Sequence, residues 1–563
     1  MANTLKKIFS PDIFIWFYPL LLIIPNIALD FTESYSILAK ISNVLFPLGI
    51  YCLIMSLWKN VGRTGALILF FALFYGAFQV VLLFLYGESI IAIDMLLNVA
   101  TTNVEEASEL LINLASAVIT ICVLYIPSLI WGIILAVKKI FPNKKKRLIL
   151  RKTGFWLTIA GVLSIVAGYI FVEGFNISKE IFPINVMRNT SIAIKRTVAT
   201  ENYHNTSASF SYNASSTHPT DDKEIYMIVI GETSRADNWQ VLGYDRPTTP
   251  LLSKREDIVA FPKVLSESNT THKSVPMLLT WLSADIFNDS IYTTKSIVTA
   301  FKEAGFSTAY FSNQGRNHSF IDFFANEADT TVFLKDDGNN HYDAELIELV
   351  GRYLKTGNNK QFLVLHTYGS HFNYIDRYPA DASVFHPDYV PLAEAKNRDQ
   401  LINAYNNTIV GTDKLLNKLA DILEAENATS AMLYVSDHGE DIFDDERERF
   451  LHASPVPTYY QIHVPMVAWM SSKYKNEYPE MFNAAQSNKD KDISSSASLF
   501  NTMMDMAGIK SNYADKSKSL VSHCYKTPAR VYLNDYNEKV NLKRAGLRET
   551  DFEQLHKHGI SDK

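Results

Sequence analysis

Five long apolar stretches near the start of the chain constrain its fold more than any other feature. They run approximately over residues 13–32, 41–58, 65–86, 113–137 and 153–173. A helix needs about 20 apolar residues to cross the hydrocarbon core of a bilayer, where every backbone polar group must pair within the protein. The pattern therefore predicts an α-helical membrane domain of five spans, over residues 1–174.

The basic residues between these stretches indicate which ends face the cytoplasm. Lys59 and Arg63 follow the second stretch, a basic run from Lys138 to Lys152 follows the fourth, and residues 64–137 contain no Lys or Arg. Because basic loops stay on the cytoplasmic side, everything after the fifth stretch is expected outside. In a Gram-negative cell this places the protein in the inner membrane and its remaining chain in the periplasm. The first stretch lacks a clear cleavage site, so we expect a retained anchor.

The segment between the third and fourth stretches is expected on the same outer side of the membrane. Helical spacing puts Asn98, Thr102, Glu106 and Glu109 along one side of a helix. The solvated face of an interfacial helix would explain this pattern. That explanation is favoured by the pattern alone, and a polar lip that holds a lipid head group is the alternative.

Residues 175–222 are expected to connect the membrane domain to the rest of the chain. Phe182 to Val198 has the pattern of an amphipathic helix, with Pro183 near its start. Thr200 to Asp222 is rich in Ser, Thr, Asn and His, which predicts a flexible linker.

From residue 223 to 563 the pattern alternates between strands and helices. Strands are predicted at Ile225–Ile230, Thr308–Phe311, Phe362–His366, Ala431–Val435 and Pro465–Met470. Helices are predicted at Ile297–Ala304, Ala344–Lys355, Arg398–Glu424 and Ser494–Ala507. This alternation predicts an α/β soluble domain with a mostly parallel sheet sandwiched by helices.

The bulk composition excludes little. A net charge of −6 gives no sign of a nucleic-acid partner. The three cysteines are Cys52, Cys122 and Cys524. Only Cys524 lies in the polar part of the chain, so no disulfide can form within that part.

The motif Asp437-His438 follows the apolar run that ends at Val435. An adjacent Asp and His at the carboxyl end of a strand can both reach into the crevice where open α/β sheets place their ligands. A carboxylate with a neutral imidazole suits zinc. An ordinary turn, in which Asp437 caps backbone groups, explains these two residues equally well.

Two other segments offer matching groups. Glu232 follows the first soluble strand at the same topological position as Asp437, where a lone carboxylate is more often a cap or an ion-pair partner. Thr271 lies just before a predicted helix over Ser274 to Trp281. It is either the N-cap of that helix or a nucleophile, since a helix start favours phosphate and a bound metal lowers a hydroxyl pKa.

Further candidates come from turns after strands. His371 lies past the end of a predicted strand and is favoured as functional, whereas His366 lies nearer the core and is favoured as structural. His452 follows an acidic loop after Asp437. The turn that contains Asn313 and Arg316 could bind phosphate oxygens, although loop solvation explains it as well.

Taken together and in order, GETSRAD, NTTHKSVPMLL, HTYGSHFNYIDRYP and SDHGE behind five membrane stretches resemble the lipid A phosphoethanolamine transferases. This family belongs to the alkaline-phosphatase/sulfatase-like superfamily. It includes the transferable polymyxin-resistance enzymes. The resemblance covers nearly the whole chain. Many members carry disulfides around the nucleophile, whereas this chain has Glu267 and Met277 at the flanking positions.

The resemblance implies a zinc-dependent enzyme and assigns its residues. One Zn²⁺ would be held by Glu232, Thr271, Asp437 and His438. His371 and His452 would stabilise the transferring group, bind a second zinc or move protons. The lipid-facing residues of the outer loop would be Asn98, Thr102 and Glu106, and Arg316 would replace a family lysine beside the phosphate.

The implied reaction is a double displacement with Thr271 as nucleophile. Thr271 attacks phosphatidylethanolamine, diacylglycerol leaves, and phosphoethanolamine then passes to a phosphate of lipid A, or to a core sugar of lipopolysaccharide. The alternatives are a membrane-anchored phosphatase/sulfatase-like hydrolase or a glycerol-phosphate transferase of the same superfamily, and a catalytically dead sensor on a membrane anchor. The intact set of Glu232, Thr271, Asp437 and His438 argues against the last of these.

Overall fold

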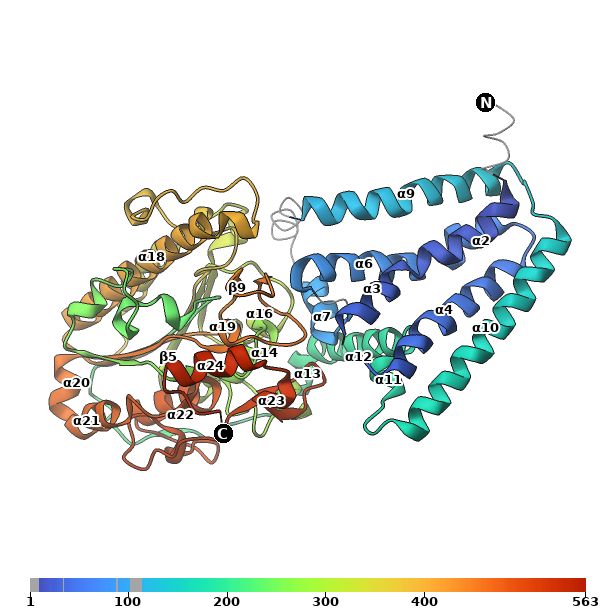
Figure 1. Ribbon diagram of the computed structural model, residues 1–563. Helices are drawn as coiled ribbons and strands as arrows, with labels where there is room; N and C mark the ends of the chain where they lie inside the picture. Colours follow the sequence, from blue (N-terminus) through green and yellow to red (C-terminus); the bar gives the residue numbers. More distant parts are fainter. Residues whose placement is uncertain (1–9, 34, 88–89, 102–113, 563) are drawn as a thin grey trace. The chain divides into compact units, whose positions relative to one another are not determined.

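The computed structural model describes residues 10–33, 35–87, 90–101 and 114–562, and the chain divides into two compact units (Figure 1). The first unit holds residues 1–96, 110–195 and 447–449, and the second holds residues 97–109, 196–446 and 450–563. The first is helical, whereas the second mixes strands and helices.

The long helices of the first unit are apolar enough to cross a membrane. Among the described residues, four candidate spans are Pro11–Thr32 (α2 and α3, Pro11–Leu22 and Ile24–Thr32), α4 (Ile37–Leu57), α9 (Ala115–Val137) and α10 (Lys144–Phe171). A fifth candidate is bent by 52° where α5 (Val61–Arg63) and the π-helical η1 (Thr64–Ile68) meet α6 (Phe70–Tyr86). The predicted helical membrane region is therefore confirmed, with four candidate spans, or five if the bent pair crosses as one.

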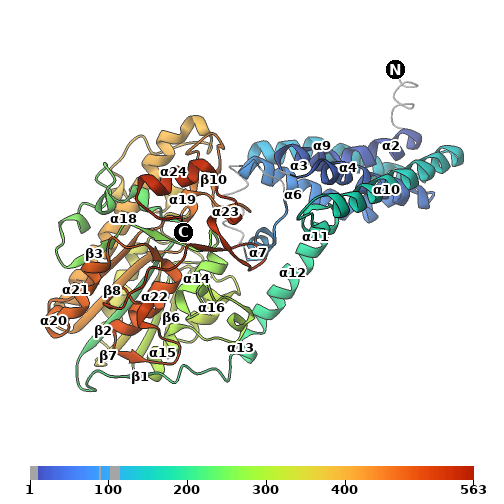
Figure 2. The ribbon, with the colours of Figure 1, turned by 60° about the horizontal axis from the view of Figure 1, so that its bottom comes forward.

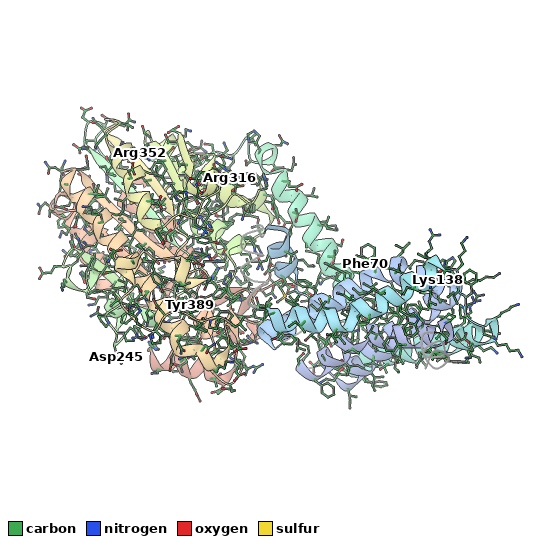
Figure 3. All side chains as sticks on the ribbon, turned by 90° about the horizontal axis from the view of Figure 1, so that it is seen from above. Phe70, Lys138, Asp245, Arg316, Arg352 and Tyr389 are labelled. Atoms are coloured by element: carbon green, nitrogen blue, oxygen red, sulfur yellow. The ribbon has the colours of Figure 1, made fainter. Side chains whose placement is uncertain are left out.

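Apolar side chains on the outside of these helices suit a lipid environment. Phe70 is 47% exposed on α6 (Figure 3), and Ile119 and Val123 are exposed on α9. Glycines let α4 and α10 pack backbone to backbone. A Cβ added to Gly154 would lie 2.9 Å from the backbone oxygen of Gly49. Small residues at helix contacts replace the hydrophobic driving force that is missing between helices in lipid.

The helix α10 begins earlier than the sequence predicts. Its first turns contain the basic run from Lys144 to Lys152, which was expected to form a loop between two spans. Asn143 is the N-cap, and its side chain accepts a hydrogen bond of 2.9 Å from the backbone N–H of Lys145. Lys and Arg have high helix propensity, so a capped basic run continues the helix beyond the apolar segment.

The structure corrects the prediction of a flexible linker at residues 200–222, because this segment packs against the second unit. Tyr203 and Tyr212 are 3% and 0% exposed and belong to the main core of the second unit. The short strand β1 (Ser215–Ser216) pairs in antiparallel fashion with β13 (Ile509–Lys510). The polar composition predicts a linker, but these few aromatic residues bury enough surface to hold the segment against the domain.

Further helices lie near the residues at which the chain passes between the two units. They are α7 (Ile93–Thr101), α11 (Ile177–Glu180), α12 (Ile184–Glu201) and α13 (Tyr203–Thr206). The helix α12 confirms the predicted amphipathic helix and is two residues shorter at its start and three longer at its end.

A seven-stranded sheet forms the centre of the second unit (Figures 1 and 2), in the order β3-β11-β8-β2-β7-β5-β6. The five strands from β8 to β6 run parallel, whereas β11 is antiparallel to both of its neighbours. The strands are β2 (Glu224–Gly231), β3 (Ile258–Phe261), β5 (Ser307–Ser312), β6 (Thr330–Phe333), β7 (Lys360–His366), β8 (Thr429–Ser436) and β11 (Met466–Met470). The predicted, mostly parallel sheet is confirmed, with β3 and β6 added at its edges.

Alternate residues of the central strands pack into two separate cores. Along β2, Tyr226, Ile228 and Ile230 belong to one core, and Ile225, Met227 and Val229 to the other. The first core is covered by α14 (Thr271–Leu279), α15 (Ile297–Glu303), α16 (Phe320–Ala325) and α22 (Ser495–Met506). The second core is covered by α17 (Leu346–Leu354) and α18 (Arg398–Ala425). Side chains in a strand point alternately to opposite faces, so one sheet serves both layers.

Small elements surround this sandwich. Two-stranded pairs are β9 with β10 (Asp441–Ile442, Phe450–Leu451), β4 with β12 (Val264–Leu265, Ile493–Ser494) and β14 with β15 (Val531–Leu533, Lys539–Asn541). The remaining α-helices described are α19 (Tyr459–Ile462), α20 (Ser472–Glu477), α21 (Pro479–Asn488), α23 (Leu542–Ala545) and α24 (Glu549–Lys557).

Candidate active site

The candidate site lies where β2 and β8 leave the sheet. These strands are parallel neighbours, so Glu232 and Asp437 emerge at the same edge. By alternation they share the face of Ile230 and Val435, which is the face covered by α14. The topology therefore brings together two carboxylates that are 205 residues apart in the sequence (437 minus 232).

Thr271 is the first residue of α14 and lies beside both strand ends. Its Oγ1 atom is 3.2 Å from Oε1 of Glu232 and 3.0 Å from Nε2 of His438. Thr270, in extended conformation, is the N-cap. The alternative that Thr271 caps the helix is therefore wrong, and the helix starts three residues before the predicted Ser274.

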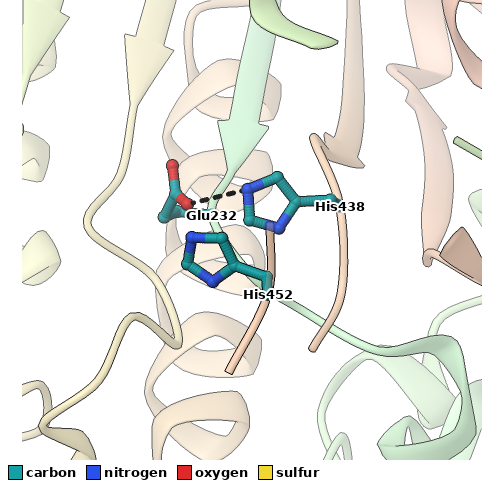
Figure 4. Close-up of side chains that lie close together, drawn as sticks. All are labelled: Glu232, His438 and His452. Atoms are coloured by element: carbon teal, nitrogen blue, oxygen red, sulfur yellow. Dashed lines mark ion pairs between the residues drawn. The ribbon is translucent and has the colours of Figure 1, made fainter. Parts of the chain in front are cut away.

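His438 presents its Nε2 atom to the two carboxylates. Nε2 lies 3.2 Å from Oδ2 of Asp437. It also lies 3.5 Å from Oε1 of Glu232, the ion pair that Figure 4 marks with a dashed line. The other ring nitrogen, Nδ1, lies 3.0 Å from the carbonyl oxygen of Gly439. A carbonyl can only accept, so Nδ1 carries the hydrogen and Nε2 keeps its lone pair, which is the form that binds a metal.

The separations within this set match those around a small tetrahedral cation. Ligands about 2 Å from a tetrahedral zinc lie about 3.3 Å from one another. The four separations above run from 3.0 to 3.5 Å. Ligand atoms of Glu232, His438 and His452 also lie within 4.8 Å of one another. The residues present therefore fit a zinc ion held by Glu232, Thr271, Asp437 and His438.

The electrostatics of the site point the same way. Burial raises the pKa of the Asp437 carboxyl, although hydrogen bonds from the backbone of Thr233 and His438 offset part of this effect. Burial also holds the pKa of His438 well below its usual range, and the neighbouring His452 adds to that shift. A divalent cation would favour both the ionised carboxylate and the neutral imidazole that it binds.

The two other predicted catalytic histidines lie beside this set. The ring of His452 is centred 4.3 Å from that of His438 and 5.7 Å from that of His371. Nδ1 of His371 donates to the carbonyl oxygen of Phe372 at 2.7 Å, which leaves its Nε2 atom as an acceptor. Burial depresses the pKa of His371, so its neutral form is favoured.

Three further residues hold the site. Sequence reasoning gave no role to Thr233 and Glu440, and it placed Gln314 only in the turn that could bind phosphate oxygens. Gln314 donates from Nε2 to Oε2 of Glu232 at 3.3 Å and to the carbonyl of Thr367 at 2.8 Å. The Thr233 hydroxyl donates to Oε1 of Glu232 at 2.8 Å. Oε2 of Glu440 lies 3.7 Å from Nδ1 of His452. Only Thr233 and Glu440 carried a signal, since they adjoin the motif residues, whereas Gln314 looks like any loop amide.

Asn98, which the outer-loop pattern assigns to a lipid head group, contacts the residue that follows Thr271. Its Oδ1 atom is 2.9 Å from Nδ1 of His272, the residue after the candidate nucleophile. Thr102 and Glu106, predicted to share its role, lie outside the described residues.

The structure does not bring Asn313 and Arg316 to the carboxylates. Nδ2 of Asn313 donates to the carbonyl of His341 at 2.9 Å and to Oδ1 of Asp343 at 2.8 Å, which fixes the neighbouring loop. Nε of Arg316 pairs with both oxygens of Asp336 at 3.0 Å (Figure 3). Neither interaction is with a residue of the candidate zinc set.

Comparison with known proteins shows the family to which the second unit is similar. A family model described as sulfatase matches residues 224–509 of the 563. The chain belongs to the sulfatase family. Within it, the Kdo(2)-lipid A phosphoethanolamine 7''-transferase of Escherichia coli K12 is 27% identical over 318 residues, which are 54% of this chain and 55% of that one. The chain thus spans about half the length of the curated relatives it matches.

Solved structures extend the likeness to the helical region. The integral membrane lipooligosaccharide phosphoethanolamine transferase A of Neisseria meningitidis has a TM-score of 0.73, covering 91% of this chain and 98% of its own at 20% identity. The periplasmic domain of Escherichia coli EptC, in complex with Zn, has a TM-score of 0.54, covering 60% and 97% at 23% identity. At these identities the likeness shows the fold, which is that of a sulfatase-family α/β domain behind a helical membrane region.

Proposed function

We propose that the protein transfers phosphoethanolamine from phosphatidylethanolamine to a phosphate of lipid A, or to a core sugar, through a phosphoethanolamine ester of Thr271. The observation that carries this is the position of the Thr271 hydroxyl, within 3.2 Å of Glu232 and 3.0 Å of His438. Thr271 is also the first residue of α14, and the start of a helix favours an anionic phosphoryl group. The transferase names of the relatives support the transferred group.

The residues of the site have distinct parts in this reaction. A bound zinc would lower the pKa of the Thr271 hydroxyl and offset negative charge on the phosphoryl oxygens. In the first step Oγ1 of Thr271 gives up its proton and forms a bond to phosphorus, the bond to the diacylglycerol oxygen breaks, and that oxygen takes up the proton. In the second step an acceptor oxygen bonds to the same phosphorus and Oγ1 of Thr271 leaves.

The neighbouring histidines are suited to move the protons of both steps. Nε2 of His371 is an acceptor because Nδ1 is engaged with Phe372, so it can take the proton of the acceptor group. His452, next to both His371 and His438, can stabilise the transferring group. The same two side chains offer ligands for a second zinc.

The proposal also assigns a location and a lipid-facing residue. Both substrates are lipids, so the catalytic unit would act on the periplasmic side of the bacterial inner membrane. Asn98, together with Thr102 and Glu106, would hold the donor head group. The contact between Asn98 and His272 supports this for Asn98, since His272 follows Thr271 directly.

The test measures both products from labelled phosphatidylethanolamine with the full-length protein. We expect diacylglycerol and labelled acceptor from the unchanged protein, and neither from Thr271→Ala. The matched control is Thr270→Ala, because Thr270 is the N-cap but makes no side-chain capping bond. Release of free phosphoethanolamine at the same rate with and without acceptor would instead support the hydrolase alternative.

A further inference from the structure

We propose that His366 is a positioning residue of the zinc site, which donates a hydrogen bond from Nε2 to Oε2 of Glu232 and so holds Oε1 toward the metal. The sequence favours His366 as a structural residue, and its position at the edge of the core agrees with that as far as packing is concerned. The inference rests on the proposed function only in that it takes the Glu232 set to be a zinc site.

The sheet register brings His366 to the candidate site. It is the last residue of β7, and it pairs with Ile230 of β2 and with Ser312 of β5. Phe362 and Val364, four and two residues earlier on β7, belong to the core under α14. By alternation His366 points to that same face, next to the end of the strand from which Glu232 emerges.

The surroundings of His366 leave one of its nitrogens without a partner. The side chain is completely buried. Nδ1 lies 3.4 Å from the hydroxyl of Tyr310. Nε2 has no hydrogen-bond partner within the part of the chain that the structure describes, and it lies 4.0 Å from Oε2 of Glu232. Burying a ring nitrogen without a partner is unfavourable, so its direction toward a carboxylate calls for an explanation.

The hydrogen on the ring can be assigned from these contacts. The His366 side chain is completely buried, which disfavours a charged ring, so the ring is neutral and carries one N–H. Burial also raises the pKa of Tyr310 above its ordinary value, so its hydroxyl keeps its hydrogen and can donate to Nδ1. The single ring hydrogen then lies on Nε2. In the opposite arrangement a lone pair would face the Glu232 carboxylate, which is repulsive.

A small movement would complete the hydrogen bond. A separation of 4.0 Å exceeds an ordinary N–H···O bond by about 1 Å. Oε1 of Glu232 already accepts from Thr233 at 2.8 Å and from Thr271 at 3.2 Å. Oε2 accepts from Gln314 at 3.3 Å, and more distantly from Thr271 at 3.5 Å. With His366 added, Oε2 would be held by two donors away from the metal and Oε1 would face it. Such outer contacts typically change metal affinity 10–100-fold.

The test compares two replacements of similar size in the full-length protein, using zinc affinity measured by competition with a chromophoric chelator. His366→Met removes the donor, whereas His366→Gln can place an amide N–H near the position of Nε2. We expect His366→Met to weaken zinc binding at least tenfold and His366→Gln to stay within about threefold of the unchanged protein. Thermal unfolding of the metal-free proteins reports any loss from packing alone.

A second variant tests the assignment of the ring hydrogen. Tyr310→Phe touches no zinc ligand, yet it removes the group that holds the hydrogen on Nε2, so it should also weaken zinc binding. In the His366→Met background the same change should have no further effect on zinc affinity. Tyr353→Phe is the matched control, because Tyr353 is a buried tyrosine of the opposite core. Its zinc affinity should equal that of the unchanged protein.

Two outcomes would overturn the proposal. One is zinc affinity in His366→Met equal to that of the unchanged protein. The other is equal weakening in His366→Met and His366→Gln, accompanied by loss of metal-free stability, which would assign His366 to packing. If the unchanged protein binds zinc and these variants do not differ, the positioning role fails while the proposed function stands. If the unchanged protein binds no zinc, the proposed zinc chemistry fails first.

Discussion

Glu267 offers a quantitative test of how the segment before Thr271 is held. This carboxyl is 3% exposed, and its Oε2 atom accepts from the backbone N–H of Ser496 at 3.2 Å. Burial raises its pKa from the ordinary 4.5 to about 7, and the hydrogen bonds to Ser496 offset part of that effect. Glu267→Gln keeps the shape and an accepting oxygen but removes the ionisation.

The direction of the pH effect on stability depends on whether the folded or the unfolded chain binds the Glu267 proton more tightly. The folded chain holds the Glu267 proton up to about pH 7, whereas the unfolded chain releases it near pH 4.5. The stabilisation from this group is therefore complete below pH 4.5, is lost as the pH rises toward 7, and stays lost above it. A pKa of about 7 against 4.5 corresponds to about 3 kcal/mol of unfolding free energy. Glu267→Gln should be more stable than the unchanged protein at pH 8 by up to about that amount.

Thermal unfolding of the full-length protein in detergent at pH 4.5 and pH 8 measures this difference. About 3 kcal/mol should raise the unfolding midpoint of the second unit by a few degrees at pH 8, with little change at pH 4.5. Glu256→Gln, at an exposed position, should change neither midpoint. If Glu267→Gln lowers the midpoint at pH 8, the ionised carboxylate is needed for the fold and the reasoning is refuted.

Three further outcomes are expected. Asn98→Ala should slow the donor step several-fold, measured by diacylglycerol release, and metal analysis should find its zinc content unchanged. If the variant and the unchanged protein release diacylglycerol at equal rates, Asn98 belongs only to a solvated helix face. Arg235 is buried and pairs with Asp444 at 3.0 and 3.1 Å. Asp444→Ala removes this partner, so it should lower the unfolding free energy by about 3–5 kcal/mol. A shift of the unfolding midpoint by less than a degree would contradict this. Prolonged chelation should abolish transfer and added zinc should restore it, whereas transfer that survives loss of all bound metal would exclude a metal role.

The ranges of the central strands and the sheet edge at which Glu232 and Asp437 emerge were predictable because both follow from short-range patterns. Apolar runs of strand length followed by polar turns located β2 and β8, and a parallel sheet places their carboxyl ends at one edge. Glu232 and Asp437 could therefore be paired from the sequence. The contact of Thr271 with His438 needed the position of α14 relative to the sheet, which no local pattern contains.

Other features depended on contacts between distant segments. Tyr203 and Tyr212 bury a stretch whose polar composition predicts a linker, since composition does not show where an aromatic side chain packs. His366 was interpreted as structural because it lies nearer the core of its strand than His371. Its distance from Glu232 is set by the pairing of β7 with β2, which the sequence does not show. Arg316 was expected beside the phosphate, whereas its ion pair with Asp336 depends on the fold of a loop 20 residues later.

The most direct test of the central claim is to map the covalent adduct by mass spectrometry. The full-length, zinc-loaded protein is incubated with phosphatidylethanolamine without acceptor, digested, and searched for phosphoethanolamine on threonine. The account predicts an adduct on Thr271 that disappears when lipid A is added and never forms in Thr271→Ala. An adduct on Thr270 or Thr233, or full transfer activity in Thr271→Ala, would contradict it.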